Sequence, residues 1–218
     1  MNFKTSAISL RMIVRLIFAV GLTPLAYSQT VPGCGELRPP GQYGPLDSRK
    51  DLSGMPIVLG AHFTPEVELL IRGKAGTLGG DIGYTLRAIP NYHRALISMM
   101  RLGVKLNTQQ PPGATYTLDC WFKRAIVFAP DDAIVRMIYS TYLGSLNKFE
   151  EANTQLDIAV GYARDNAFTH YNIGLHFFDI KNYSKALQQA HRALELDWPR
   201  TELKEQLITV DKWIEPKQ

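Results

Sequence analysis

Five histidines are the first residues to consider for chemistry, because an imidazole can serve as a metal ligand or as an acid–base group. They are His62, His93, His170, His176 and His191. No two lie three or four positions apart, the spacing that would place both on one helical face around a metal, and none belongs to an H-E-x-x-H motif. We therefore predict packed or surface histidines, with neither a metal site nor a cofactor.

The densest group of titratable side chains lies between residues 62 and 94 and comprises His62, Asp81, Tyr84, Arg87, His93 and Arg94. Two interpretations are open. The group could form a polar recess around Asp81, Arg87 and His93 that binds a small ligand or supports catalysis. Alternatively, these side chains form hydrogen bonds that tie an irregular N-terminal segment to the rest of the chain, which is the interpretation we favour.

No other pattern in the chain indicates a catalytic site. The glycine-rich run at 73–80 is not a phosphate-binding loop, because Glu68 and Ala75 stand where that motif needs a glycine and a Ser or Thr. A G-x-S-x-G nucleophile motif and a C-x-x-C pair are both missing from the sequence. The acidic pair Asp131-Asp132 precedes a helical pattern and is typical of helix N-caps. We therefore predict no catalytic residues and no enzyme.

Residues 1–28 have the pattern of an export signal. Lys4, Arg11 and Arg15 precede a short apolar run at 16–22, and Ala26-Tyr27-Ser28 places small residues where a signal peptidase cleaves. The alternative is an uncleaved anchor, but the run is shorter than the roughly 20 residues of a spanning helix. We expect export to the periplasm or cell envelope, with no membrane insertion after cleavage.

The charge balance argues against nucleic-acid binding. The whole chain has 24 basic and 20 acidic residues, net +4, and the three basic residues of the signal account for most of that excess. The remaining chain is almost neutral, whereas nucleic-acid binding needs clustered positive charge along a face.

The chain has two cysteines, Cys34 and Cys120. In an exported protein an even number of cysteines favours a disulfide, which here would attach the N-terminal segment to a helix. The alternative is that Cys120, beside Trp121 and Phe122, is a buried free thiol.

The segment before residue 91 divides into an arm and a helical part. Residues 29–63 form a Pro/Gly-rich arm without helical periodicity, in which 57–63 are expected to be a short extended piece. Residues 64–90 are expected to be helices that pack on the repeats described next. One would begin at Thr64 and run to about Arg72, and another, over 82–88, would have Asp81 as its cap and end near Pro90.

The strongest signal is internal repetition towards the C-terminus. Residues 133–166 shifted by 34 fall on 167–200, which aligns Phe149 with Tyr183 and Ser140 with Gly174. The same shift aligns small residues that would let helices approach closely, namely Ala125, Ala152, Ala159, Ala186 and Ala193. An earlier helix over 92–102 aligns at an offset of 41 if Leu102-Gly103 matches Leu143-Gly144.

This pattern resembles the tetratricopeptide repeat (TPR) family. Its G-x2-Y element appears as Gly174-x2-Phe177, and a closing proline appears as Pro130 and, one place late, as Pro199. The family's tryptophan is replaced by Arg136 and His170. The resemblance implies an all-α fold, a short solenoid of about three helical hairpins over 91–199, with a capping helix in 200–218. Residues 79–96 are also similar to uncharacterised exported bacterial repeat proteins.

In this family the first helix of each repeat lines a concave groove, and the resemblance implies a partner-binding groove here. Its expected residues are His93, Leu96, Met100, Ile134, Met137, Thr141, Phe168, Tyr171, Leu175 and Phe178. Such an apolar and aromatic surface suits a peptide segment of another protein with bulky apolar side chains. The alternative is that the N-terminal segment folds into the groove. The sequence thus favours an interaction module or assembly scaffold over a small-ligand binder, and leaves the oligomeric state undetermined.

Overall fold

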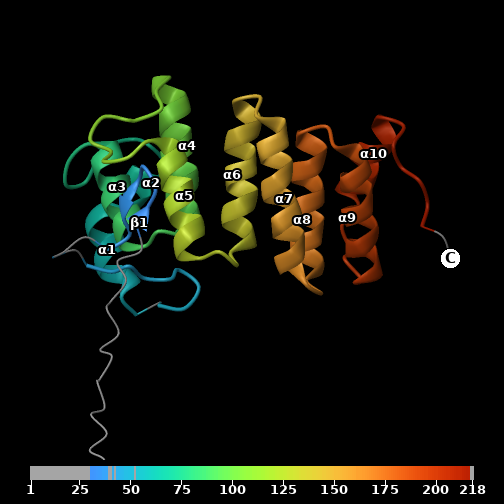
Figure 1. Ribbon diagram of the computed structural model, residues 1–218, viewed down its shortest axis with the longest axis horizontal. Helices are drawn as coiled ribbons and strands as arrows, with labels where there is room; N and C mark the ends of the chain where they lie inside the picture. The colour runs from blue at the N-terminus through green and yellow to red at the C-terminus, as the bar shows by residue number, and fades with distance from the viewer. Residues whose placement is uncertain (1–29, 39–40, 42, 52, 217–218) are drawn as a thin grey trace, which may run out of the picture.

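The computed structural model describes residues 30–38, 41, 43–51 and 53–216, so the expected export signal at 1–28 lies outside the described residues. Figure 1 shows the described chain as a row of helices with one short β-hairpin near its N-terminal end. The described residues form ten α-helices and a single two-stranded sheet, which confirms the all-α class. None of the helices in this part of the chain is long and apolar enough to cross a membrane.

The β-hairpin is held against a helix by a disulfide. Strand β1 (Thr30–Val31) pairs antiparallel with β2 (Gly35–Glu36), and Cys34 in the turn is bonded to Cys120 of α5 (Leu118–Phe128). The expected disulfide is therefore confirmed. Arg124 of α5 adds hydrogen bonds from Nη1 to the carbonyl oxygens of Cys34 and Glu36, at 2.9 and 2.8 Å. The disulfide and these hydrogen bonds together hold the start of the arm on α5.

The next part of the chain is more helical than its composition indicates. Residues 57–63 were expected to be extended, but α1 (Met55–His62) forms there with Pro56 in its first turn. The reason is packing: Met55 and Val58, three positions apart, are buried against Ala88 and Ile89. The helix expected from Thr64 to Arg72 is also shorter than predicted. Helix α2 (Pro65–Glu68) ends where Leu70 adopts a φ of 58°.

Helix α3 (Leu78–Ala88) begins earlier than expected, because Thr77 rather than Asp81 caps it by accepting a hydrogen bond from the Gly80 N–H. Asp81 lies in the first turn and holds the preceding loop instead. Its Oδ2 accepts from the backbone N–H groups of residues 74–76 at 2.7–3.2 Å. The carboxylate thus holds the backbone of the glycine-rich run in place, and this contact accounts for the conformation of the run.

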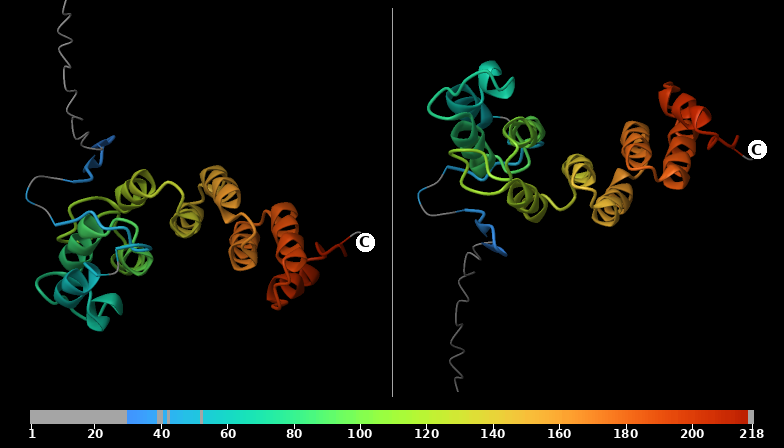
Figure 2. Two further views of the ribbon diagram at one scale, coloured as in Figure 1. Left: turned by 90° about the horizontal axis from the view of Figure 1, so that it is seen from below. Right: turned by 90° about the horizontal axis from the view of Figure 1, so that it is seen from above.

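Six helices then follow one another, which Figure 2 shows nearly end-on. They are α4 (His93–Leu106) followed by α5, and then two closely packed antiparallel pairs, α6 (Ala133–Ser145) with α7 (Phe149–Ala163) and α8 (Ala167–Asp179) with α9 (Tyr183–Glu195). The first helices are neighbours in series, since α4 packs on α6 and α6 on α8. A final helix, α10 (Glu202–Thr209), covers α9 with the buried Leu203 and Leu207. It is shorter than the capping helix expected in 200–218, and Ile214, beyond its end, is 67% exposed.

The last two pairs repeat each other in detail. Helices α8 and α9 begin at the predicted offset of 34 from α6 and α7. Arg136 donates from Nε and Nη2 to the Pro130 carbonyl and from Nη1 to Gln155 Oε1. His170, at the same offset from Arg136, pairs with the Arg164 carbonyl and with Gln189 Oε1. Two different side chains therefore make the same pair of contacts at the same place in consecutive hairpins.

The earlier helices match at an offset of 40 rather than the expected 41. The starts of α3 and α4 precede those of α5 and α6 by this offset, and Pro90 corresponds to Pro130. The matched Leu-Gly dipeptides are therefore one position out of register. Because one residue turns a helix by about 100°, this shift changes which side chains of α4 face outward.

The small residues that the repeat predicts at helix contacts are buried there. Ala125, Ala152, Ala159 and Ala186 are fully buried. At Gly174 a Cβ would lie 2.4 Å from Leu203 Cδ2 and 3.2 Å from Gln189 Cβ, so α8, α9 and α10 approach one another too closely for a side chain.

Two matched glycine substitutions test this packing. Gly161→Ala in α7 meets no atom within 4 Å and should raise the free energy of unfolding by about 0.5–1 kcal/mol through helix propensity. Gly174→Ala should lack this gain and be at least about 1 kcal/mol less stable than Gly161→Ala, because its methyl group displaces neighbours. Urea denaturation followed by circular dichroism measures both, and equal stabilisation of the two variants would contradict the close approach at Gly174.

Candidate binding surface

The first helices of the last two pairs expose apolar side chains on a shared face. Ile134 of α6 is 39% exposed and Phe168 of α8 is 52% exposed, and the two occupy the same helix position in consecutive hairpins. Two to three turns further along lie Thr141, which is exposed, and Leu175 and Phe178, which are half-buried. We call these five residues the α6–α8 surface.

Three expected groove residues are part of the core instead. Leu96, Met137 and Tyr171 are 1%, 4% and 5% exposed. Tyr171 also donates a hydrogen bond to Glu202 of α10 at 2.8 Å and packs on Trp198 with a ring separation of 5.6 Å. In this conformation these side chains stabilise the helix pairs and are not accessible to a partner.

The corrected offset also changes the expected contribution of α4. With an offset of 40, the positions of Ile134 and Thr141 correspond to Arg94 and Arg101 rather than to His93 and Met100, which are both half-buried. Arg94 forms an ion pair with Glu68 of α2, and Lys105 donates to the Leu70 carbonyl at 3.1 Å. The α2 segment therefore packs along α4, and the α6–α8 surface is the open part of the row.

The N-terminal arm does not occupy this surface in its described residues. Residues 30–37 pack on α5, and residues 46–49 bind the loops before α4 and α6 through Ala88, Asn91 and Asp131. The alternative in which the arm fills the groove is thus not observed for the part of the arm that the structure describes.

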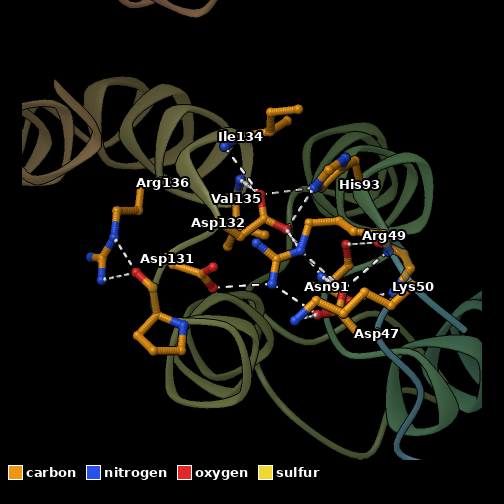
Figure 3. A network of polar contacts seen from close by, with 12 residues as sticks. Asp47, Arg49, Lys50, Asn91, His93, Asp131, Asp132, Ile134, Val135 and Arg136 are labelled. Carbon is orange, nitrogen blue, oxygen red and sulfur yellow. Dashed lines mark hydrogen bonds and ion pairs between the residues drawn. The ribbon is translucent and has the colours of Figure 1, made fainter. Parts of the chain in front are cut away.

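A buried carboxylate joins this arm to the start of α6, as Figure 3 shows. Asp132 is 2% exposed and caps α6 by accepting from the N–H groups of Ile134 and Val135 at 3.1 and 3.2 Å. Its carboxylate oxygens also lie 3.0 Å from His93 Nε2, and Oδ2 accepts from Asn91 Nδ2 at 3.0 Å. The same group that begins α6, and so positions Ile134, is therefore bonded to the loop and first turn of α4.

Arm residues complete the network. Asn91 donates a second amide hydrogen to Asp47 Oδ1 at 2.8 Å, and Arg49 bridges Asp47 and Asp131 with ion pairs of 2.8 and 3.0 Å. The Arg49 guanidinium is the leading cause that holds the pKa of Asp47 and of Asp131 below the usual range of a carboxyl group. A charged arm segment is in this way fixed at the junction of two helix pairs.

Opposing effects set the pKa of Asp132. Burial by itself raises it, but the hydrogen bond and charge of His93, together with the Val135 N–H and the Asn91 amide, lower it below its usual value overall. The ionised form is thus the stable one in the folded protein.

The expected polar recess around Asp81, Arg87 and His93 is divided among separate contacts. His62 Nδ1 lies 2.9 Å from Asp81 Oδ1, and the His62 ring stacks on Tyr84 at 3.9 Å. Arg87 lies over Tyr84 and bonds to Thr115, while His93 belongs to the Asp132 network. These contacts join α1 to α3, α3 to the loop before α5, and α4 to the start of α6, so the three residues do not face one shared recess.

Across the described residues, no three His, Cys, Asp or Glu side chains group in a way that would hold a metal ion. The chain matches no protein-family model, no curated protein and no solved structure.

Replacing the buried carboxylate should separate its effect from that of its exposed neighbour. Asp132→Asn keeps an oxygen for the cap but weakens the bonds from His93 and Asn91, so we expect a loss of about 1–2 kcal/mol in unfolding free energy near pH 7. Asp131→Asn, whose side chain is 56% exposed, should change it by less than about 1 kcal/mol.

The dependence of the unfolding free energy on pH tests whether ionised Asp132 stabilises the fold. Because the folded pKa of Asp132 is depressed, its contribution is complete above the unfolded value of about 3.9 and is lost as pH falls through the folded pKa. Denaturant titrations between pH 2 and 7 should show a shallower acid loss in Asp132→Asn than in the native protein. Parallel curves would show that Asp132 is not the linked group.

Proposed function

We propose that α4–α9 are three tetratricopeptide-type repeats. The common offset of 34 between α6–α7 and α8–α9, the equivalent contacts of Arg136 and His170, and the close approach at Gly174 support this assignment. Each hairpin buries one face on the next, which is the physical basis of a repeat solenoid.

We propose further that the protein is an interaction module that holds a segment of another protein on the α6–α8 surface. The observation that carries this proposal is the exposure of Ile134 and Phe168 at equivalent positions of adjacent helices. Neither side chain belongs to the buried core, although Phe168 packs on Trp198 with a ring separation of 5.5 Å. Burial by a partner would contribute roughly 1.5–3 kcal/mol for each. Bulky apolar side chains of a peptide are the complementary chemistry.

The module is proposed to act in an oxidising compartment outside the cytoplasm, such as the periplasm or cell envelope. The Cys34–Cys120 disulfide supports this location, because structural disulfides persist where thiols are not kept reduced. The signal-like pattern at 1–28 agrees with it.

Crosslinking and affinity capture from an envelope extract test the proposal. The double variant Ile134→Asp/Phe168→Asp should lose a partner that the native protein retains, because two carboxylates would be buried in the contact. Ile158→Asp in α7 is the matched control, since Ile158 is 38% exposed on a second helix, and it should retain the partner. Unchanged circular dichroism confirms that both variants fold.

The comparison of partner capture by the native protein and the two variants decides whether the proposal holds. A partner lost only from the double variant supports the α6–α8 surface. Equal capture by all three proteins would place binding elsewhere, and capture by none of them would remove the support for an interaction module in that extract.

A further inference from the structure

The end of α2 and the end of α4 expose apolar side chains more strongly than the α6–α8 surface does. Leu69 and Ile71, on either side of the buried Leu70, are 69% and 66% exposed, and Val104 in the last turn of α4 is 70% exposed. Figure 2 shows the teal segment that follows α2 at the end of the helix row opposite to α10. Apolar side chains that gather at one place on a surface are typical of a site for another molecule.

A defined backbone conformation holds the first two of these side chains in place. Leu70 adopts a φ of 58°, in the left-handed region that is unfavourable for a leucine, and its side chain packs in the core. The Ile71 N–H closes the turn by donating to the Glu66 carbonyl at 2.9 Å. Leu69 and Ile71 are therefore exposed by an ordered turn of the chain.

One face of α4 lies beside this turn. Ser98 Oγ donates to the Glu68 carbonyl and Lys105 Nζ donates to the Leu70 carbonyl, both at 3.1 Å. Arg101 is exposed and lies between Ser98 and Lys105 at the spacing of one helix face. Basic side chains of α4 therefore border the exposed turn that follows α2.

Basic residues surround the exposed apolar side chains. We define the α2–α4 tip as Leu69, Ile71, Arg72, Lys74, Arg101, Val104 and Lys105. Helix α4 contains no acidic residue, and the two acids of α2, Glu66 and Glu68, are each paired with an arginine. Among the described residues, neither an ion pair nor a side-chain hydrogen bond holds Lys74 or Arg101. The tip thus has cations that the fold does not use.

The positive charge of the tip is local. The chain beyond residue 28 is almost neutral as a whole, so the cations gathered here are not part of a general basic surface. An anionic surface is the complementary partner. A lipid surface suits this tip better than a folded acidic protein does, because apolar side chains that protrude by two thirds need no matching pocket in lipid.

We propose that the α2–α4 tip docks the protein on a membrane that contains anionic phospholipids. Leu69, Ile71 and Val104 enter the boundary between headgroups and acyl chains. Lys74 and Arg101 extend their charged ends to the lipid phosphates. This inference does not depend on the α6–α8 surface, since it rests on other residues and on a different kind of partner.

Flotation with lipid vesicles tests the charge requirement. All proteins are produced from the same full-length sequence, so they share one N-terminus and differ only at the substituted residues. The native protein should bind vesicles of phosphatidylglycerol and phosphatidylcholine more tightly than vesicles of phosphatidylcholine alone, and salt at about 1 M should weaken this binding. Lys74→Gln/Arg101→Gln should weaken it by at least about tenfold, because each basic residue near an anionic surface adds roughly fivefold to affinity.

A second double variant controls for the loss of charge itself. Lys181 and Lys212 are exposed, line a cavity that includes the first turn of α9, and lie outside the tip. Lys181→Gln/Lys212→Gln removes the same charge from the chain and should bind anionic vesicles as the native protein does.

Tryptophan fluorescence locates the contact. Leu69→Trp should be quenched by anionic vesicles with brominated acyl chains, because its indole enters the boundary region. Ile158→Trp in α7, at a position that is 38% exposed, should not be quenched. The native protein measures the background from its own tryptophans, Trp121, Trp198 and Trp213.

The outcomes separate this inference from the proposed function. Weaker binding by the Lys74→Gln/Arg101→Gln protein, together with quenching of the Leu69→Trp protein, supports the membrane site even if no partner is captured at Ile134 and Phe168. Equal binding by the two double variants, equal binding to neutral vesicles, or an unquenched Leu69→Trp protein overturns it. Binding of polyglutamate in place of vesicles also overturns it, and would assign the tip to an acidic protein.

Discussion

The order of the last two hairpins depends on how each of them holds the loop in front of it. A first helix that begins after a turn leaves the carbonyl groups of that turn without partners, and buried carbonyls must be satisfied. Arg136 and His170 satisfy one such carbonyl each, at Pro130 and Arg164, and each also reaches a glutamine on the second helix of its own pair. A single side chain therefore sets the distance between loop, first helix and second helix, and the two hairpins have the same arrangement because both contain it.

This interaction also explains how a turn without proline keeps its shape. Arg164 adopts a φ of 50°, a positive value that costs a non-glycine residue roughly 1 kcal/mol or more. Its carbonyl is bonded to His170 Nε2 at 2.6 Å, so the helix that follows the turn stabilises the unfavourable backbone. A guanidinium and an imidazole can thus occupy equivalent positions of consecutive hairpins, because both make hydrogen bonds to the preceding loop and to the second helix.

The periodic part of this fold could be predicted from the sequence, and the irregular part could not. Helices α6–α9 follow from alanines and aromatics that recur at a constant offset, because each packs in a local environment that the next hairpin reproduces. At α4 the repeat length changes, and matching by one Leu-Gly dipeptide gave a register wrong by one residue. The counterpart of Met137 on α4 is therefore the half-buried Ile97 rather than Leu96, and both Met137 and Leu96 are core residues. The disulfide followed from counting cysteines, but the Asp132 network joins groups 39 to 41 residues apart, and no local pattern shows such a contact.

The distribution of unpaired groups separates the part of the molecule that is closed from the part that is open. Around α4, the charges of Arg94, Asp132 and Asp81 are all matched by groups from the α2 segment, the arm or the glycine-rich loop. Between α6 and α8, several groups have no such partners. Ile134 and Phe168 face solvent there, and neither the buried hydroxyl of Ser140 nor the charge of Asp179 finds a partner among the described residues. The exposed apolar area of Ile134 and Phe168 does not stabilise the fold, although Phe168 also packs on Trp198 with a ring separation of 5.5 Å. Unsatisfied polar groups oppose folding as well. The position of Ile134 and Phe168 on two adjacent helices of the same layer is what a surface completed by another molecule requires.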